Sequence, residues 1–443
     1  MSTLERRGFR LGFATLALFT GIAGDFWRDA TSWYGWGVVI AVVVAGSIVL
    51  VVRQRRRFRW STLPYPLLAF LVLATLSISW SFYPLFTVGG ALSQWITTLG
   101  AVAIAITLSW PELLTVLGWT FRLVLGLSFL FEFVVSAVIR HPVYPVWIVP
   151  DDPAHPAKLL YWSRDLLFHA GKIQGILGNS SLLAMAALLG LIVFAVQYRV
   201  RSVGRFWGLF WMLVAAVAIG LTRSATILVG VVAVVIVLLA AIVVRHAESR
   251  RARRLTYGGI GLVAILLIAG GVLFRGPILS LLGKSSDFTG RTGIWQAVID
   301  LARQRPAFGW GWLSYWVPTI EPFRSMNLTR GGVQVLHAHD AWLDVWLQLG
   351  ILGLIVFAAL VLSTVVRSWL LATDRIVTEP GSTGRFSWLA LLPLLMITAQ
   401  LVQSIAESRM LLEGGWMLLV IWAVKTKATP LDSETQAREL LRS

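Results

Sequence analysis

Residues 225–244 read ATILVGVVAVVIVLLAAIVV, a run of twenty residues without a charged side chain. The hydrocarbon core of a bilayer is about 30 Å thick, and a helix needs about 20 apolar residues to cross it. This stretch is therefore long enough to span a membrane as an α-helix. Similar runs recur along the 443-residue chain, which predicts an all-α polytopic membrane protein.

The composition excludes the common soluble classes. Hydrophobic residues make up 57 % of the chain and charged residues 13 %, and the mean hydropathy is +0.77. Soluble domains carry about 25 % charged residues, so a water-soluble globule is excluded, and so is intrinsic disorder. The chain has no cysteine, which excludes a disulfide framework, a thiolate nucleophile and a Cys-ligated metal site.

About twelve apolar runs are expected to cross the membrane, with the tenth beginning as a helix outside it. They are 11–25, 34–52, 63–80, 86–109, 113–138, 175–197, 206–222, 225–244, 256–274, 340–366, 386–406 and 411–424. Arginines precede the first run as in a signal peptide, but no small-residue cleavage site follows, so we expect an uncleaved span. The spans divide the chain into 1–174 (five spans and a first outer loop), 175–274 (four spans), 275–339 (a large outer loop), 340–424 (three spans) and 425–443 (a cytoplasmic tail).

The distribution of basic residues predicts sidedness. The net charge is +17, from 38 basic and 21 acidic residues. With the N-terminus in the cytoplasm, inner segments hold 23 basic residues and outer segments 14. The arginine-rich inner segments 53–59 and 245–254 then act as topology signals beside anionic headgroups, and no nucleic-acid partner is expected. Both termini are predicted to be cytoplasmic.

Two long outer loops, 139–174 and 275–339, hold eleven of the 14 outer basic residues. Long ordered loops are often functional. The second loop contains apolar residues at helical spacing, which predicts a short amphipathic helix of about 13 residues lying on the outer membrane surface. Its apolar stripe comprises Ile294, Trp295, Val298, Leu301 and Ala302. Pro306 is expected to stop this helix, and Gly309 and Gly311 to break the chain again.

Arg291 is expected at the N-terminus of this helix, where free N–H groups favour an anion. A guanidinium there could hold a phosphate in two hydrogen bonds, or it could simply extend toward lipid headgroups. Indoles crowd the same loop. They could stack on sugar rings or serve as ordinary interfacial tryptophans, namely Trp295, Trp310, Trp312 and Trp316.

His337, His339, Asp340 and Asp344 fall where the outer loop meets the next span. Three interpretations remain open at this point. The His-x-His pair and a carboxylate could bind a metal, one histidine could deprotonate a hydroxyl, or both could be interfacial histidines.

Further polar residues lie near predicted membrane edges. Arg223 occupies a very short outer turn, a costly position unless it is partnered or wet. Asn179 lies just inside the sixth span. Arg122 and Glu132 are isolated charges in the fifth span, about 15 Å apart along a helix, and are expected to face protein or water without a direct pair.

Several motifs, in this order, resemble the O-antigen ligase/polymerase family, and most closely its exopolysaccharide-production branch. They are QGILGNSSLLA (174–184), LTRSA (221–225), TGRTGIW (289–295), RPAFGWGW (305–312), HAHDAWLDVWLQLGILGL (337–354) and ESRMLLEGGWMLLVIW (407–422). The likeness extends over about 170–425. Glu407 and Trp416 fall where the pattern places them.

The resemblance implies a membrane glycosyltransferase that uses an undecaprenyl-pyrophosphate-linked glycan on the outer face of the bacterial cytoplasmic membrane. The acceptor would be a glycan or glycolipid hydroxyl, as for a polysaccharide polymerase or an O-antigen-type ligase. No metal, nucleotide sugar or other cofactor is implied, and polysaccharide-assembly proteins are conceivable partners. Carried over by position, Arg223 and Arg291 match the pyrophosphate-binding arginines, and His339 matches the catalytic base.

Two positions depart from the family pattern. Asp340 replaces the asparagine that usually follows the histidine, so this carboxylate could orient His339 or mark a different acceptor. Gln174 replaces an arginine before the Gly-Ile pair, and Lys172 or Arg164 could substitute as a phosphate contact. The expected catalytic group is therefore His339 with His337 and Asp340 nearby.

The expected chemistry is a single displacement with inversion at the sugar C1. Two arginines and a helix N-terminus suit a diphosphate leaving group, and a neutral histidine suits activation of a hydroxyl. A lipid-linked glycan transporter and a non-catalytic scaffold of a polysaccharide-assembly complex remain the alternatives.

Overall fold

The computed structural model describes residues 3–54, 60–150, 157–247, 249–273, 276–277, 291–374 and 386–428. Most of the predicted tail, parts of the inner segments and the start of the large outer loop lie outside these ranges. In the described ranges the fold is helical, apart from one two-stranded hairpin, β1 (Thr329–Arg330) and β2 (Val333–Gln334).

Each predicted span is occupied, wholly or in part, by a helix. These helices are α1 (Thr3–Ile22), α2 (Gly24–Arg53), α3 (Tyr65–Leu76), α4 (Pro84–Thr107), α5 (Trp110–Val134), α6 (Ser180–Arg199), α7 (Arg205–Thr222), α8 (Ala225–Arg245), α9 (Arg250–Leu273), α13 (Ala341–Thr373), α14 (Leu392–Ser404) and α15 (Glu413–Ala428). Among the described residues, seven helices are long and apolar enough to cross a membrane: α2, α4, α5 with its π-helical extension to Ile139, α6, α7, α8 and α13. The all-α polytopic architecture is confirmed, while the number twelve stays a prediction.

Helix α2 begins at Gly24, ahead of the expected residue 34, and kinks at Ser32, whose φ is 65°. The sequence-based boundary excluded Asp25 and Arg28 because they are charged. The structure buries both, because each finds a partner of opposite charge. At the other end of the chain, α15 continues to Ala428, beyond the predicted boundary at 424.

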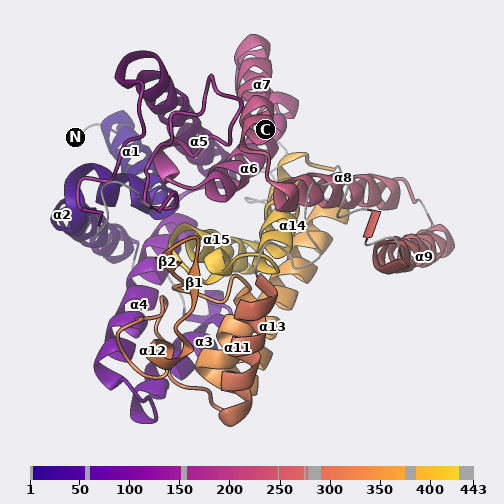
Figure 1. Cartoon of the computed structure of the whole chain (residues 1–443). Coiled ribbons are helices and arrows are strands. Elements are labelled where there is room, and N and C mark those ends of the chain that lie inside the picture. The colour runs from indigo at the N-terminus through magenta and orange to yellow at the C-terminus, as the bar shows by residue number, and fades with distance from the viewer. Residues whose placement is uncertain are drawn as a thin grey trace.

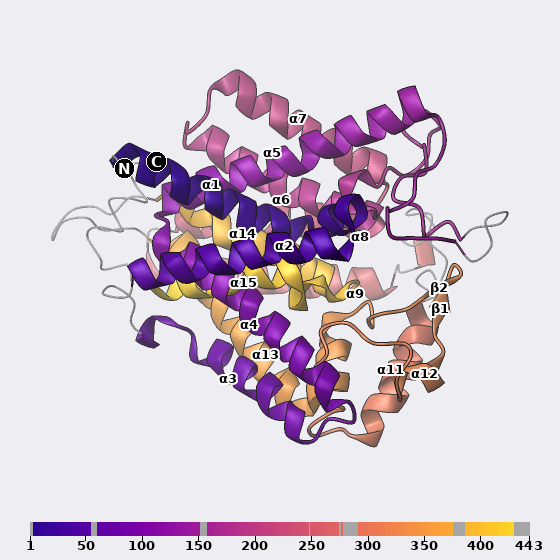
Figure 2. The ribbon, with the colours of Figure 1, turned by 90° about the vertical axis from the view of Figure 1, so that its left-hand side faces the viewer.

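Helix α15 lies at the centre of the bundle. It packs against α1, α4 and α13, and most of its side chains are buried. Figure 1 shows α5, α6 and α7 on one side of it and α3, α4 and α13 on the other. The two chain ends lie on one face of the bundle, and α11 (Arg291–Gln304), α12 (Phe323–Met326) and the hairpin lie on the opposite face (Figure 2).

Helix α11 is the amphipathic helix expected in the large loop. It is 14 residues long, and it buries Ile294, Val298, Leu301 and Ala302 against α13 and its neighbours. It is followed at once by the Pro306–Gly311 segment, in which Gly309 and Gly311 have φ angles of 69° and 111°. The stop signal and the two breaks therefore fall where the sequence places them.

The Pro306–Gly311 segment inserts into a break in α13. At Gly350 the helix departs from helical geometry, with a φ of 67°. Trp310 N–H donates to the Leu347 carbonyl at 3.0 Å, and Ile351 N–H donates to the Pro306 carbonyl at 2.8 Å. A Cβ at Gly350 would lie 2.2 Å from the carbonyl carbon of Ala307, so only glycine allows this approach. The segment thus satisfies backbone groups that the break would leave unpaired.

Candidate active site

A pair of histidines lies between the hairpin and α13. Their rings are 4.1 Å apart between centroids. His339, which has a left-handed φ of 51°, donates its backbone N–H to Nδ1 of His337 at 3.1 Å. The bond makes Nδ1 of His337 an acceptor, so a neutral His337 carries its proton on Nε2.

Glu407, in the turn between α14 and α15, joins this pair to α11. Its Oε2 lies 2.8 Å from Nδ1 of His339, and its Oε1 accepts a hydrogen bond from Nη2 of Arg291 at 2.8 Å. The side chains are 16 % (His339), 12 % (Glu407) and 13 % (Arg291) exposed, so the group is largely shielded but not sealed. An ionised Glu407 would take the proton of Nδ1 in a hydrogen bond and leave Nε2 of His339 as the basic atom.

The environment fixes the charge of two of these groups at neutral pH. Burial opposes ionisation of Glu407, but the hydrogen bond from His339 and the neighbouring positive charges outweigh it and lower its pKa to about 2. Burial, assisted by His339, lowers the pKa of His337 to about 3. Glu407 is therefore anionic, and His337 is neutral.

Two further arginines add positive charge around Glu407. Arg330 lies on β1, where burial and then the charge of Arg291 lower its pKa. Arg409 lies two residues after Glu407, and its charge adds to burial in lowering the pKa of His337. Among the described residues, the buried Nε of Arg291 has no hydrogen-bond partner. Three guanidinium groups surround one carboxylate, an excess of positive charge that suits an anionic ligand.

The backbone between the histidines is held from both sides. Asp344, buried in the first turn of α13, accepts the N–H of Ala338 at 3.0 Å and the hydroxyl of Ser408. Trp295 donates its indole N–H to the carbonyl of Ala338 at 3.1 Å. Asp344 thus links the residue before His339 to the residue after Glu407.

We expect Asp344→Asn to lower the stability of the protein by about 1–3 kcal/mol, because an amide NH₂ would face donors that now meet a carboxylate. The thermal midpoint in detergent measures this. Ser408→Ala, which removes one donor and leaves the carboxylate, should cost about 1 kcal/mol. An Asp344→Asn protein with an unchanged midpoint would contradict the described clamp.

A buried ion network adjoins the site. Arg409 contacts the hydroxyl of Tyr315 at 3.0 Å, a carboxylate oxygen of Glu413 at 3.2 Å and one of Asp25 at 3.3 Å. Arg28 contacts Glu413 at 2.7 Å and also pairs with Asp25. Two cations and two anions from α2, α15 and the turn before α15 therefore balance one another, which is what burial of charge requires.

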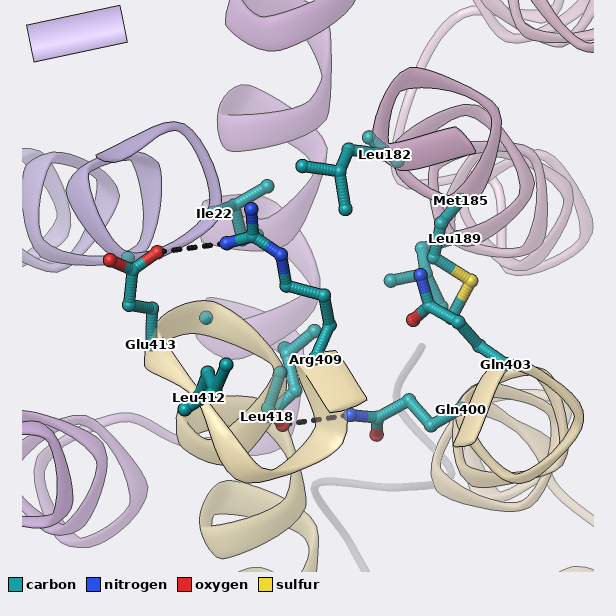
Figure 3. Close-up of a pocket in the computed structure, with 14 residues that line it drawn as sticks. Ile22, Leu182, Met185, Leu189, Gln400, Gln403, Arg409, Leu412, Glu413 and Leu418 are labelled. Carbon is teal, nitrogen blue, oxygen red and sulfur yellow. Dashed lines mark hydrogen bonds and ion pairs between the residues drawn. The ribbon is translucent and has the colours of Figure 1, made fainter. Parts of the chain in front are cut away.

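A cavity of about 60 Å³ lies beside this network, among α1, α6, α14 and α15. Figure 3 shows Arg409 and Glu413 on one side of it and Leu182, Met185 and Leu189 of α6 across from them. Arg409 therefore borders both the histidine pair and a narrow, mostly apolar space inside the bundle.

The buried His337 gives an expected pH dependence of stability. Its folded pKa lies below the usual value of about 6.5, so its contribution is complete above pH 6.5 and is lost as the pH falls toward 3. Between pH 6.5 and 4.5 the free energy of unfolding should fall by at most about 1.4 kcal/mol per pH unit. Thermal melts should show this slope in the wild type and in His141→Gln, an exposed control, and less of it in His337→Gln. An equal slope in all three proteins would contradict it.

The other predicted residues lie apart from the histidine pair. Arg223 ends α7 with a φ of 49°; it is exposed, and across the described ranges its side chain makes no hydrogen bond or ion pair. Lys172 is exposed in the first outer loop. Arg164 donates to the side chain of Gln174 at 2.9 Å, so the suggested substitute binds the residue whose place it was to take. Asn179 caps α6, accepting the N–H groups of Ser181 and Leu182.

Two predicted roles are filled by other residues. Asp340 caps α13, accepting the N–H groups of Trp342 and Leu343 at 2.8 and 2.9 Å, and burial raises its pKa. The carboxylate that contacts His339 is Glu407 instead. The ring of Trp312 is fully buried against Phe70, so we place it in the core and not at a sugar-binding surface.

The sequence did not single out Glu407, Arg330 or Arg409 as site residues. Three charges in an otherwise apolar stretch, at Glu407, Arg409 and Glu413, were a usable signal for the last turn. Arg330 had none, because only the hairpin brings it to the site. In the fifth helix, Arg122 and Glu132 face other protein groups, as expected: Arg122 contacts Gln197 at 2.6 Å, and Glu132 accepts the N–H of Gln174 at 2.8 Å.

His337, His339 and Glu407 also offer ligand atoms that lie within 4.8 Å of one another. Two imidazoles and a carboxylate are donors that zinc accepts. Here, however, Glu407 is already paired with Arg291, and Arg330 and Arg409 add positive charge. The donor set fits an anion better than a divalent cation.

Residues 209–358 match the family model described as O-antigen ligase. The chain carries an O-antigen ligase family segment. The resemblance found from the motifs is thereby confirmed. The O-antigen ligase segment contains Arg223, Arg291 and His339 and ends before Glu407.

A curated relative agrees with this assignment. Over 140 residues the chain is 31 % identical to the exopolysaccharide production protein ExoQ of Rhizobium meliloti (strain 1021). The alignment covers 31 % of this chain and 31 % of the relative, so the chain spans about a third of the relative's length. Together with the apolar helices, this relative indicates a bacterial membrane protein.

Proposed function

We propose that the protein is a membrane glycosyltransferase. It moves a glycan from an undecaprenyl-pyrophosphate donor to a hydroxyl acceptor, on the outer face of the cytoplasmic membrane and with both termini inside. The acceptor is a growing glycan or a glycolipid. The family match supports the class of reaction, and the large loop with its site supports the face of the membrane at which it occurs.

One observation carries the proposal. His339, Glu407 and Arg291 form a continuous chain in which each contact is 2.8 Å long. A histidine oriented by an ionised carboxylate is the arrangement expected of a general base. An arginine with an unpartnered Nε beside it is the arrangement expected of a phosphate ligand.

The reaction is a displacement at the anomeric carbon. The acceptor hydroxyl attacks C1 of the donor sugar while Nε2 of His339 takes its proton. The bond between C1 and the diphosphate oxygen breaks, and its electron pair leaves with the lipid diphosphate. Attack from the face opposite the leaving group inverts C1. Glu407 stabilises the imidazolium that forms, as a buried carboxylate does for a catalytic histidine.

The cations have the complementary role. Arg291 and Arg330 neutralise charge that develops on the leaving diphosphate. The N-terminus of α11, where Arg291 lies, adds the positive end of a helix dipole. Arg223, in the O-antigen ligase segment, would contact the same diphosphate from the α7–α8 turn once the donor is bound.

The test is transfer by the purified protein in liposomes. A donor with a labelled undecaprenyl-pyrophosphate glycan and a separate acceptor should give a longer or lipid-bound glycan, and the same donor glycan as a nucleotide sugar should give none. The product should form equally in the presence of a chelator. Passage of the labelled lipid across the bilayer without a new glycosidic bond would support the transporter instead. Full product in cells carrying His339→Ala would support a scaffold.

A further inference from the structure

A second basic pocket lies away from the histidine pair. It is lined by Trp80, in the turn between α3 and α4, and by residues 305–309, which follow α11. Its volume is about 460 Å³, which is ample for a small polar headgroup. The two walls are joined, since Trp80 donates its indole N–H to the carbonyl of Phe308 at 3.1 Å.

Arg305 is the charged residue of this pocket. Its guanidinium carbon lies 3.9 Å from the ring centroid of Phe82 and 5.0 Å from that of Trp310. Its one hydrogen bond is a long one, 3.4 Å, to the carbonyl of Trp80. Within the described part of the chain, no carboxylate lies within ion-pair distance of Arg305. The aromatic rings fix the guanidinium and leave its charge uncompensated.

The rim of the pocket is apolar and exposed. Phe82 is 55 % exposed, Phe308 54 % and Leu85, which follows in α4, 81 %. Ile351 and Ile355 of α13 lie just beyond the insertion and are exposed as well. Ile351 and Ile355 lie within a helix that is apolar enough to cross the membrane, so this rim meets lipid and not water.

The pocket is also preformed. Pro306 and Ala307, part of its wall, are the residues whose carbonyls accept the N–H groups of Ile351 and Leu352 at 2.8 and 3.3 Å. Phe82 N–H donates to the carbonyl of Trp310 at 3.4 Å. A ligand therefore meets Arg305 in place and does not have to order a loop first.

We propose that this pocket binds the phosphate of an anionic phospholipid, with Arg305 as its ligand and with the acyl chains lying along Phe82, Phe308 and α13. A guanidinium without a counter-ion, stacked on aromatic rings beside exposed apolar side chains, matches a phosphodiester attached to hydrocarbon. An anionic headgroup is favoured over a choline headgroup, because the cation of choline would oppose Arg305. This site is separate from the proposed transfer reaction and does not depend on it.

The test is native mass spectrometry of the detergent-solubilised protein titrated with phosphatidylglycerol. Arg305→Gln should reduce the fraction of protein that carries the lipid by at least about five-fold. Arg303→Gln is the matched control, since Arg303 lies on the same loop side, is largely exposed and is already near Asp300. It should retain wild-type binding, and Arg305→Lys should fall between.

Each other outcome has a meaning. Equal binding by Arg305→Gln and wild type, or an equal loss in Arg303→Gln, would overturn the site. Equal uptake of phosphatidylcholine would overturn the preference for an anionic lipid, and displacement by soluble glycerol phosphate would identify a free-phosphate site. If Arg305→Gln does not fold, a photoreactive phosphatidylglycerol on the wild type decides. Cross-links should map to residues 80–85 or 305–309, and cross-links elsewhere would overturn the proposal.

Discussion

Replacing His339 with alanine is expected to lower the rate of glycan transfer by about 100- to 10,000-fold, the usual contribution of a general base. The loss should appear in kcat with little change in the KM for the donor, because His339 acts on the acceptor proton. Glu407→Gln should give a smaller loss of kcat, since His339 keeps its position through the backbone but loses its carboxylate. Initial rates with a labelled lipid-linked donor measure both.

His169→Ala is the matched control for His339→Ala. His169 lies in the first outer loop, its side chain is 66 % exposed, and it has no contact with the proposed site. Its replacement should leave transfer near the wild-type rate. A folded His339→Ala protein with more than about a tenth of wild-type kcat would rule out His339 as the base.

The second large effect is expected at Arg291. Arg291→Ala should lower kcat/KM by about 100- to 1,000-fold, since one preorganised cation at developing charge contributes about that much. Arg291→Lys should recover only part of it, because an ammonium cannot hold Glu407 and a phosphate oxygen in the same planar geometry. Competition by an unreactive undecaprenyl-pyrophosphate analogue would report donor affinity separately from rate.

Arg303→Ala controls for charge on the same helix. Arg303 is largely exposed and near Asp300, so transfer should not change. Normal donor affinity and normal kcat in Arg291→Ala would refute a phosphate role. Equal losses in Arg291→Ala and Arg303→Ala would indicate a general effect of the helix charge instead.

The sequence predicted well those features that follow from local periodicity. Uninterrupted apolar runs located the long helices, and spacing located the buried stripe of α11. Pro306, Gly309 and Gly311 marked where the chain leaves that helix. These signals depend on side chains within a few turns of one another, so they can be read without knowing the fold.

Partners that are distant in sequence were out of reach. His339 and Glu407 are separated by 68 residues, and nothing local shows which carboxylate a histidine will meet. Adjacency favoured Asp340, but free N–H groups at the start of α13 take that side chain as a cap. The same reasoning applies to α2, where charges that looked like loop residues are buried because Glu413 and Arg409 lie opposite.

The insertion at Gly350 also limits how the protein could open to admit a substrate. Swinging α11 and the residues after it outward would strip several peptide groups of their partners within an apolar environment, at several kcal/mol for each group. That segment should behave as part of the scaffold. Any gate must then lie in pieces not stitched to α13, of which the β1–β2 hairpin with Arg330 is the nearest, so entry of a donor and placement of a phosphate ligand would be one movement.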